Sequence, residues 1–155
     1  MTTDPLPDPG DVLPYGYPAL QVDRVLRQDP RRLVAAKAIS YYELDSHRGG
    51  GRPGRFPSSL MIESFLQSCG LLVAAGPAGG AGHLLIFASA RNIRVLGSAH
   101  AGDLLIHTVD LVDRYEDTAT FTGTSRVGEG TVLSVERAMT VLRPAGAVAA
   151  RPVTA

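Results

Sequence analysis

The sequence has 155 residues, of which 45% are hydrophobic and 19% are charged. This size suits one domain with a buried core, and the composition excludes an intrinsically disordered chain. Fifteen acidic residues balance fifteen basic ones, so the sequence lacks the basic excess that nucleic-acid binding requires. We therefore expect no nucleic-acid partner. No run of about 18 apolar residues occurs, so we also expect no membrane span.

The sequence begins with a segment rich in proline and aspartate. We expect residues 1–12 to form a flexible N-terminal arm, residues 13–143 a single domain, and the Ala/Pro-rich residues 144–155 a flexible tail.

Cys69 is the only cysteine, which excludes an internal disulfide and fits a reducing cytoplasm. No basic-then-apolar leader is visible, so we expect no secretion signal.

Two short strands are predicted at 21–26 and 31–39, joined by a turn at Asp29 and Pro30, and a glycine-rich loop follows over 46–59. A helix is then predicted from Ser58 or Ser59, either of which can cap it, to about residue 75. Apolar side chains surround this helix almost completely, which indicates that it is buried. Further strands are predicted at 83–89, 92–96, 104–112, 118–127 and 132–142. One buried helix and consecutive strands predict an α+β fold, with the helix wrapped by an antiparallel sheet.

Glu63 is the residue whose position is hardest to explain by packing alone. It lies near the start of the apolar helix, where burying a carboxylate is costly unless it is paired or protonated. Gln67 follows one turn later and can hydrogen-bond to it. Burial would favour the protonated form and make Glu63 a candidate general acid. Alternatively, the helix start is partly exposed and Glu63 interacts only with the helix dipole.

His47 lies in the glycine-rich loop before that helix. It can form an acid/base pair with Glu63, because imidazole titrates near physiological pH; the alternative is an ordinary solvated loop histidine. Backbone N–H groups near Ser58 and Ser59 at the helix start can hold a thioester oxygen as it gains negative charge. The other histidines are expected to be ordinary strand or turn residues, and their spacing predicts no metal site.

Four segments occur in an order that is typical of one enzyme family. They are LPYGYPALQVDRV at 13–25, MIESFLQSCGLL at 61–72, FAS at 87–89 and AGDLL at 101–105. In these segments the chain resembles the β-hydroxyacyl-acyl-carrier-protein dehydratases of fatty-acid and polyketide synthesis, and the resemblance extends over 13–142.

The resemblance implies a hot-dog fold and a dimer whose sheets join edge to edge, with a substrate tunnel at the interface. It implies dehydration of a 3-hydroxyacyl thioester, held by an acyl carrier protein, to the trans-2-enoyl thioester without metal or organic cofactor. Glu63 matches the family's helix acid, which protonates the leaving hydroxyl, while a histidine of the other protomer takes the α-proton. A backbone N–H at Ser58 would bind the thioester carbonyl, and Gln67 is in register with the family's glutamine.

The loop before the helix departs from the family's His-Phe-Pro-Gly pattern. Counting back from Glu63 without gaps places Gly49 at the histidine position, and two extra loop residues would restore His47. Three interpretations therefore stay open. The chain is an active dehydratase using His47 and Glu63, or a catalytically impaired hot-dog subunit that forms a heterodimer with an active paralogue, or an acyl thioesterase or enoyl isomerase.

Overall fold

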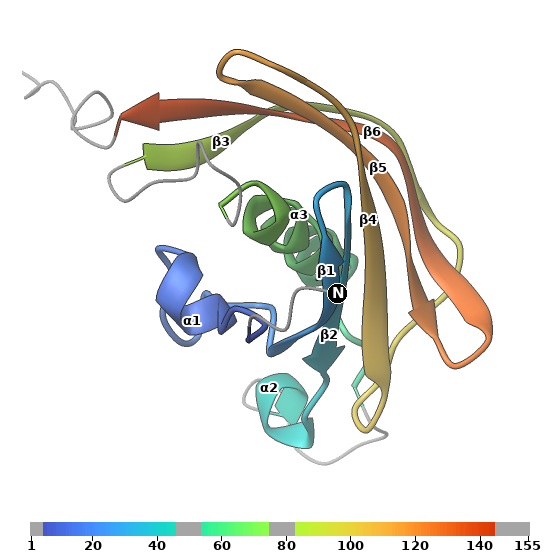
Figure 1. The fold of residues 1–155 in the computed structure, drawn as a ribbon. Helices are drawn as coiled ribbons and strands as arrows, with labels where there is room; N and C mark the ends of the chain where they lie inside the picture. The colour runs from blue at the N-terminus through green and yellow to red at the C-terminus, as the bar shows by residue number, and fades with distance from the viewer. Residues whose placement is uncertain (1–4, 46–53, 75–82, 145–155) are drawn as a thin grey trace, which may run out of the picture.

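The computed structural model describes residues 5–45, 54–74 and 83–144. In these ranges a six-stranded antiparallel sheet curves around one long helix (Figure 1). The strand order is β1-β2-β4-β5-β6-β3, so β1 and β3 form the two edges. The elements are α1 (Pro9–Val12), β1 (Arg24–Asp29), β2 (Arg32–Ala38), α2 (Tyr41–Asp45), α3 (Ser58–Ala74), β3 (His83–Val95), β4 (Leu104–Tyr115), β5 (Thr118–Val127) and β6 (Gly130–Pro144). This is the wrapped helix that the sequence pattern predicts and the hot-dog arrangement that the resemblance implies.

The central helix α3 lies between the sheet and the N-terminal part of the chain, where α1 is found (Figure 1). Its sequence predicts burial on nearly every side, and the structure confirms this for the second half of the helix. Ten of its residues are buried: Met61, Ser64, Phe65, Gln67, Ser68, Cys69, Gly70, Leu71, Leu72 and Val73. Gly70 allows close packing, because a Cβ there would lie 3.3 Å from Leu13 and 3.5 Å from Leu85.

The sheet curves around α3 because residues of small volume and irregular pairing occur where the helix crosses it. At Gly123 of β5, a Cβ would collide with the Thr108 carbonyl oxygen and lie 2.9 Å from the Phe65 ring. The missing side chain therefore lets Phe65 of α3 pack directly on the backbone of the sheet. The pairing of β5 with β6 shifts register beside Gly123, and such bulges increase the local bend and twist of a strand.

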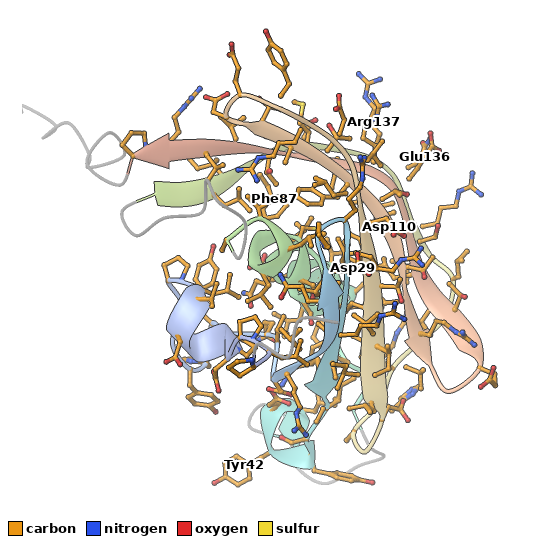
Figure 2. All side chains as sticks on the ribbon, viewed as in Figure 1. Asp29, Tyr42, Phe87, Asp110, Glu136 and Arg137 are labelled. Atoms are coloured by element: carbon orange, nitrogen blue, oxygen red, sulfur yellow. The ribbon has the colours of Figure 1, made fainter. Side chains whose placement is uncertain are left out.

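The two faces of the sheet differ in polarity. Inward positions of β4 alternate with outward ones along the strand, and Leu105, His107 and Val109 are fully buried. Phe87 of β3 packs against the same core, whereas Asp110 and Glu136 lie on the outer side of the sheet (Figure 2).

Three elements differ from the sequence prediction. The strands expected at 83–89 and 92–96 form one strand, β3, with a register shift between Phe87 and Ser89. The first strand begins later than predicted, at Arg24. Helix α2 was not predicted, although Ser40 and Glu43 form a capping box: the Ser40 hydroxyl accepts from the Glu43 N–H, and the Glu43 carboxylate accepts from the Ser40 N–H.

The terminal regions are described only in part. Within the segment expected as an N-terminal arm, α1 forms one helical turn, and the Asp8 carboxylate accepts a hydrogen bond from the Gly10 N–H at its start. Residues 145–155 of the expected tail lie outside the described residues. Of the helices in the described ranges, none combines the length and the apolar character that crossing a lipid bilayer requires.

Candidate active site

The structure brings two of the predicted site residues together on α3. Glu63 is half-buried and Gln67 is buried one turn later. The Gln67 Nε2 donates a hydrogen bond of 2.9 Å to Glu63 Oε1. Glu63 is therefore neither enclosed in the core nor free in solvent, and one of its oxygens has a fixed partner.

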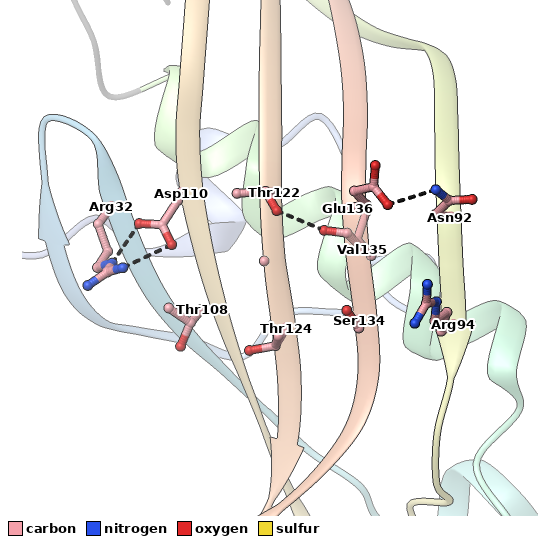
Figure 3. A pocket seen from close by; sticks show the side chains of 11 residues that line it. Arg32, Asn92, Arg94, Thr108, Asp110, Thr122, Thr124, Ser134, Val135 and Glu136 are labelled. Carbon is pink, nitrogen blue, oxygen red and sulfur yellow. Dashed lines mark hydrogen bonds and ion pairs between the residues drawn. The ribbon is translucent and has the colours of Figure 1, made fainter.

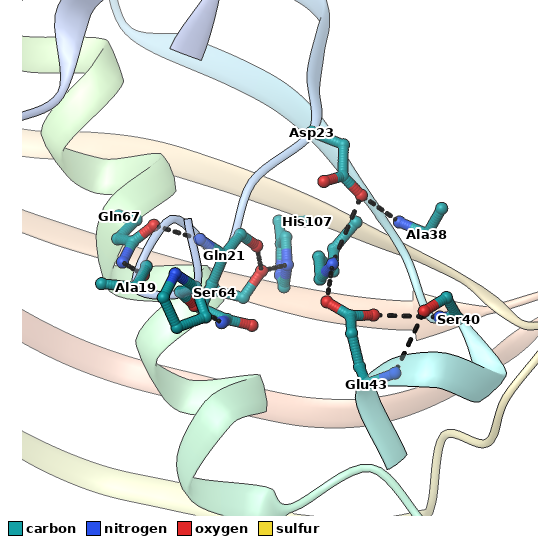
Figure 4. A network of polar contacts seen from close by, with 11 residues as sticks. Ala19, Gln21, Asp23, Ala38, Ser40, Glu43, Ser64, Gln67 and His107 are labelled. Atoms are coloured by element: carbon teal, nitrogen blue, oxygen red, sulfur yellow. Dashed lines mark hydrogen bonds and ion pairs between the residues drawn. The ribbon is translucent and has the colours of Figure 1, made fainter. Parts of the chain in front are cut away.

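Gln67 also fixes the N-terminal segment across α3. Its Nε2 donates to the Ala19 carbonyl at 2.9 Å, and its Oε1 accepts from the Gln21 N–H at 2.7 Å (Figure 4). Reversing the amide would set its oxygen against the Ala19 carbonyl and its NH₂ against the Gln21 N–H, so only one orientation satisfies both neighbours. The side chain that orients Glu63 is thus itself held by two backbone groups.

Tyr15, on the same N-terminal segment, lies close enough to Glu63 for the negative charge of the carboxylate to affect its phenol. The pKa of its phenol is raised from the ordinary value, first by partial burial and second by the negative charge of Glu63. Glu63 therefore has Gln67 as a hydrogen-bond partner and Tyr15 within range of its charge. A half-buried carboxylate beside a phenol and an amide can hold and move a proton at a bound hydroxyl.

The residues just before α3 are held by backbone contacts with the segment that follows β3. Phe56 is buried and its N–H donates to the Ala99 carbonyl at 2.8 Å, next to a bridge between Arg55 and His100. The helix begins at Ser58, and the Met61 N–H bonds to the Pro57 carbonyl.

The N–H groups of Ser58 and Ser59 precede that bond, so they have no acceptor within the helix. Ser58 is half-buried and Ser59 is exposed. They lie a little more than one helical turn before Glu63, and their role as oxyanion donors stays a prediction.

His47 lies outside the described residues, so its position relative to Glu63 stays a prediction. The chain that leads into its loop is well anchored. Lys37 is buried, and its Nζ lies 2.6 Å from Glu43 Oε1 on α2 and 3.6 Å from Asp23 Oδ2 (Figure 4). Partial burial works to raise the pKa of Glu43, but hydrogen bonds from Lys37 and Ser40 hold it below its usual value.

His107 was expected to be an ordinary strand residue, and its role in a buried polar line was missed. Its Nε2 lies 2.7 Å from Ser64 Oγ and its Nδ1 lies 2.7 Å from Ser125 Oγ, and all three side chains are fully buried. Burial lowers the pKa of His107 to about 3. His107 alternates in the sequence with Leu105 and Val109, and Ser64 interrupts the apolar helix, so these two polar residues were the available signal.

Neither a metal cluster nor a reactive thiol occurs in the described part of the chain. Its His, Cys, Asp and Glu side chains form no group of three that could hold a metal ion. Cys69 is a buried free cysteine, as predicted, and burial raises the pKa of its thiol well above the ordinary value. This places Cys69 among packing residues rather than nucleophiles.

A hollow of about 550 Å³ lies on the outer face of the sheet, on the side away from α3 (Figure 3). Two pairs of its polar side chains are hydrogen-bonded to each other. Arg32 forms two hydrogen bonds with Asp110, of 2.6 and 3.0 Å, and Asn92 donates to Glu136 at 2.7 Å. The hollow is separated from Glu63 by the sheet, so it is not part of the candidate site.

Sequence relatives share most of the chain. A protein of Tolumonas auensis named 3-hydroxyacyl-acyl-carrier-protein dehydratase FabZ is 33% identical over 134 residues, which cover 81% of this chain and 86% of the relative. The protein of the same name from Vibrio vulnificus is 31% identical over 128 residues, covering 81% and 85%. The one from Thermus thermophilus is 35% identical over 97 residues, covering 61% and 67%.

Solved structures share the fold at lower identity. The dehydratase heterocomplex ApeI:P from Xenorhabdus doucetiae contains a chain that superposes with a TM-score of 0.73 at 16% identity, covering 88% of this chain and 91% of that one. A hypothetical thioesterase from Streptococcus pneumoniae, solved with coenzyme A, gives 0.60 at 14% identity, covering 78% and 85%. No model of a known protein family matches the sequence. The fold and the extended identity to the curated relatives show that the chain belongs to the 3-hydroxyacyl-acyl-carrier-protein dehydratase (FabZ) family.

Proposed function

We propose that the chain dehydrates a 3-hydroxyacyl thioester to the trans-2-enoyl thioester in fatty-acid or polyketide biosynthesis. Glu63 is the acid in this proposal, and His47 of the other protomer is the base. The observation that carries the proposal is the half-buried Glu63 carboxylate, which Gln67 holds at one oxygen. The other oxygen is then available to a substrate hydroxyl. Dehydration is also the reaction in the names of the relatives.

The reaction needs one proton removed and one supplied. His47 takes the α-proton, and the electron pair of the C–H bond forms the new double bond between the α- and β-carbons. The bond from the β-carbon to the hydroxyl oxygen breaks, and Glu63 gives this oxygen a proton, so that water leaves. The N–H groups at Ser58 and Ser59 hold the thioester oxygen while negative charge develops on it. No electron acceptor or metal enters this balance.

A dimer is part of the proposal because the base belongs to the other protomer. The edge strand β3 supports it. It is 13 residues long, pairs with β6 on one side, and has no described strand on the other. Long open edges pair readily with a second chain. Ile86, Val95 and Leu96 are exposed along this region, and a second sheet joined there would cover apolar surface that the single chain leaves in water.

The carrier of the substrate is proposed to be an acyl carrier protein, the carrier in the relatives' names. The cytoplasm is the proposed compartment, because the one cysteine is a buried thiol without a disulfide partner.

The test compares the wild type with two Glu→Gln variants. Purified protein is incubated with a 3-hydroxyacyl thioester of a carrier protein, and enoyl product is followed by mass spectrometry as the loss of water. Glu63→Gln should reduce turnover by at least about 100-fold, the order expected when a general acid is removed. Glu129→Gln, at a fully exposed glutamate, should leave it unchanged. Equal turnover in all three proteins contradicts the assignment of Glu63.

A second candidate function is that of a partner subunit in a heterodimer. The departure of the loop sequence favours it, because ungapped counting places Gly49 and not His47 at the base position. In this case the purified chain alone is inert, and an active hot-dog paralogue restores dehydration. His47→Ala distinguishes the two: it abolishes activity of a homodimer and leaves a heterodimer unaffected. Inertness in every combination contradicts both candidates, and release of free thiol would instead indicate a thioesterase.

A further inference from the structure

A line of hydrogen bonds crosses the core from β5 to the N-terminal segment. The His107 ring on β4 bridges Ser125 of β5 and Ser64 of α3, with 2.7 Å on each side. The Ser64 hydroxyl continues the line to the Gln21 carbonyl at 2.6 Å (Figure 4). The Ser125, His107 and Ser64 side chains have no exposed surface, so the line is isolated from water.

The acceptor at one end and the neutral ring of His107 together fix the direction of every bond. The Gln21 carbonyl can only accept, so the Ser64 hydroxyl donates to it. Ser64 Oγ must then accept from His107 Nε2–H, and the bare Nδ1 accepts from the Ser125 hydroxyl. This pattern needs a neutral ring, and the low pKa of His107, about 3, keeps the ring neutral at physiological pH. The groups packed against the ring, Ser64 and Phe65 of α3 and Ser125 of β5, carry no charge.

A second set of bonds runs from Gln21 to the carboxylate. The Gln21 N–H donates to Gln67 Oε1 at 2.7 Å, and Gln67 Nε2 donates to Glu63 Oε1 at 2.9 Å. The carbonyl and the N–H of Gln21 belong to different peptide units, so the two sets of hydrogen bonds are not electronically continuous. They are connected only because both fix the position of the Gln21 backbone. The Ser64 hydroxyl, to which His107 Nε2 is bonded, is thus one of the contacts on the residue whose N–H holds the Gln67 amide.

The line is not explained by stability alone. Replacing buried hydrogen-bonded partners with apolar groups of similar shape is often nearly neutral for stability. The ring of His107 packs edge-on against Phe65, with centroids 6.2 Å apart, and its two nitrogens face the Ser64 and Ser125 hydroxyls. An aliphatic side chain in place of His107 would offer no N–H to the Ser64 hydroxyl, which donates to the Gln21 carbonyl.

We infer that His107 is a positioning residue, which acts through Ser64, the Gln21 backbone and Gln67 to fix the orientation of the Glu63 carboxylate. The inference rests on the proposed function in one respect, namely that Glu63 is the acid. Small displacements of a reacting group reduce turnover steeply, by about 100-fold for about 1 Å. Loss of the line should therefore reduce kcat, because binding of the acyl chain does not depend on the orientation of one carboxylate.

The test uses three variants in the full chain, assayed with the active wild-type assembly as reference. His107→Leu removes the donor and acceptor at similar volume, and His107→Gln retains one N–H donor and one acceptor. Val109→Ala is the matched control, because Val109 is equally buried on the same face of β4 but takes no part in the line. Two quantities are measured: kcat and KM, and the exchange rate of the Gln67 side-chain amide protons by NMR.

We expect His107→Leu to lower kcat about 10- to 100-fold with little change in KM, and to accelerate exchange at the Gln67 amide. His107→Gln should restore kcat and the exchange rate of the Gln67 amide most of the way to the wild-type values. Val109→Ala should lower stability while kcat and the exchange rate stay at the wild-type values. If His107→Leu does not fold, Ser64→Ala cuts the same line by removing one oxygen and carries the same expectations.

Failure of the inference and failure of the proposed function give different results. Full kcat in His107→Leu, in an assembly that Glu63→Gln inactivates, overturns the inference and leaves the function intact. A wild type that dehydrates nothing, alone or with a paralogue, contradicts the function. The amide exchange still decides the inference in that case, because unchanged exchange in His107→Leu would show that Gln67 does not depend on His107.

Discussion

Acidification should destabilise this protein through one buried histidine. The ordinary histidine pKa of 6.5 falls to about 3 for His107 in the fold, because the ring is almost completely removed from water. Below pH 6.5 the unfolded chain therefore binds a proton at this residue that the folded protein does not. The contribution of His107 is fully present above pH 6.5 and is lost as the pH falls toward 3.

The magnitude follows from the separation of the two pKa values. Each pH unit well inside this interval is worth roughly 1.4 kcal/mol. The free energy of unfolding should therefore fall by about 2 kcal/mol between pH 6.5, where the unfolded histidine is already half protonated, and pH 4.5 from this residue alone. A single domain has about 5–15 kcal/mol in total. Loss of this size should therefore be visible in a urea titration at each pH.

The variant His107→Gln isolates the effect, because it cannot titrate yet keeps a donor and an acceptor. At pH 7.5 it should be within about 1–2 kcal/mol of the wild type, and it should lose about 3 kcal/mol less than the wild type on going to pH 4.5. His100→Gln, at an exposed ring, should follow the wild type. The same pH dependence in His107→Gln as in the wild type would refute the reasoning.

Three further variants test how the site is supported, each by chemical denaturation. Gly123→Ala should lower the free energy of unfolding by about 1–3 kcal/mol through overpacking against Phe65, whereas Gly16→Ala, with open space around it, should change it little; equal effects would contradict the packing account. Lys37→Met should cost about 1–3 kcal/mol, because it leaves the half-buried Glu43 unpaired, and adding Glu43→Leu should recover part of the loss. Gln67→Leu should cost about 1–3 kcal/mol and also reduce turnover, since it frees the Glu63 carboxylate; unchanged turnover would separate Gln67 from the reaction.

The sequence predicts well those features that a short stretch of chain determines. The apolar residues of α3 specify a buried helix, and the strand predicted at 104–112 is observed as β4. The pairing of Glu63 with Gln67 could be predicted because both residues lie on one helix, one turn apart.

The features that sequence reasoning missed depend on distant contacts or on weak local signals. Gln67 bonds to Gln21 across 46 positions, and His107 bonds to Ser64 across 43, and no local pattern specifies such partners. Strand β3 was divided in the prediction because Ser89 and its small neighbours resemble a turn, whereas pairing with β6 keeps the backbone extended. The helix α2 was missed although its capping signal was present, because five residues give no hydrophobic period.

The most direct test of the central claim, that Glu63 exchanges a proton with a β-hydroxyl, is an isotope experiment. The 3-hydroxyacyl thioester is incubated with the protein in water that carries a heavy oxygen isotope, and the label is located by mass spectrometry. Reversible dehydration places the heavy oxygen at the β-carbon in the wild type and leaves the thioester intact, and Glu63→Gln should show no incorporation. Label found in a free carboxylate, or equal β-labelling by Glu63→Gln, would contradict the account.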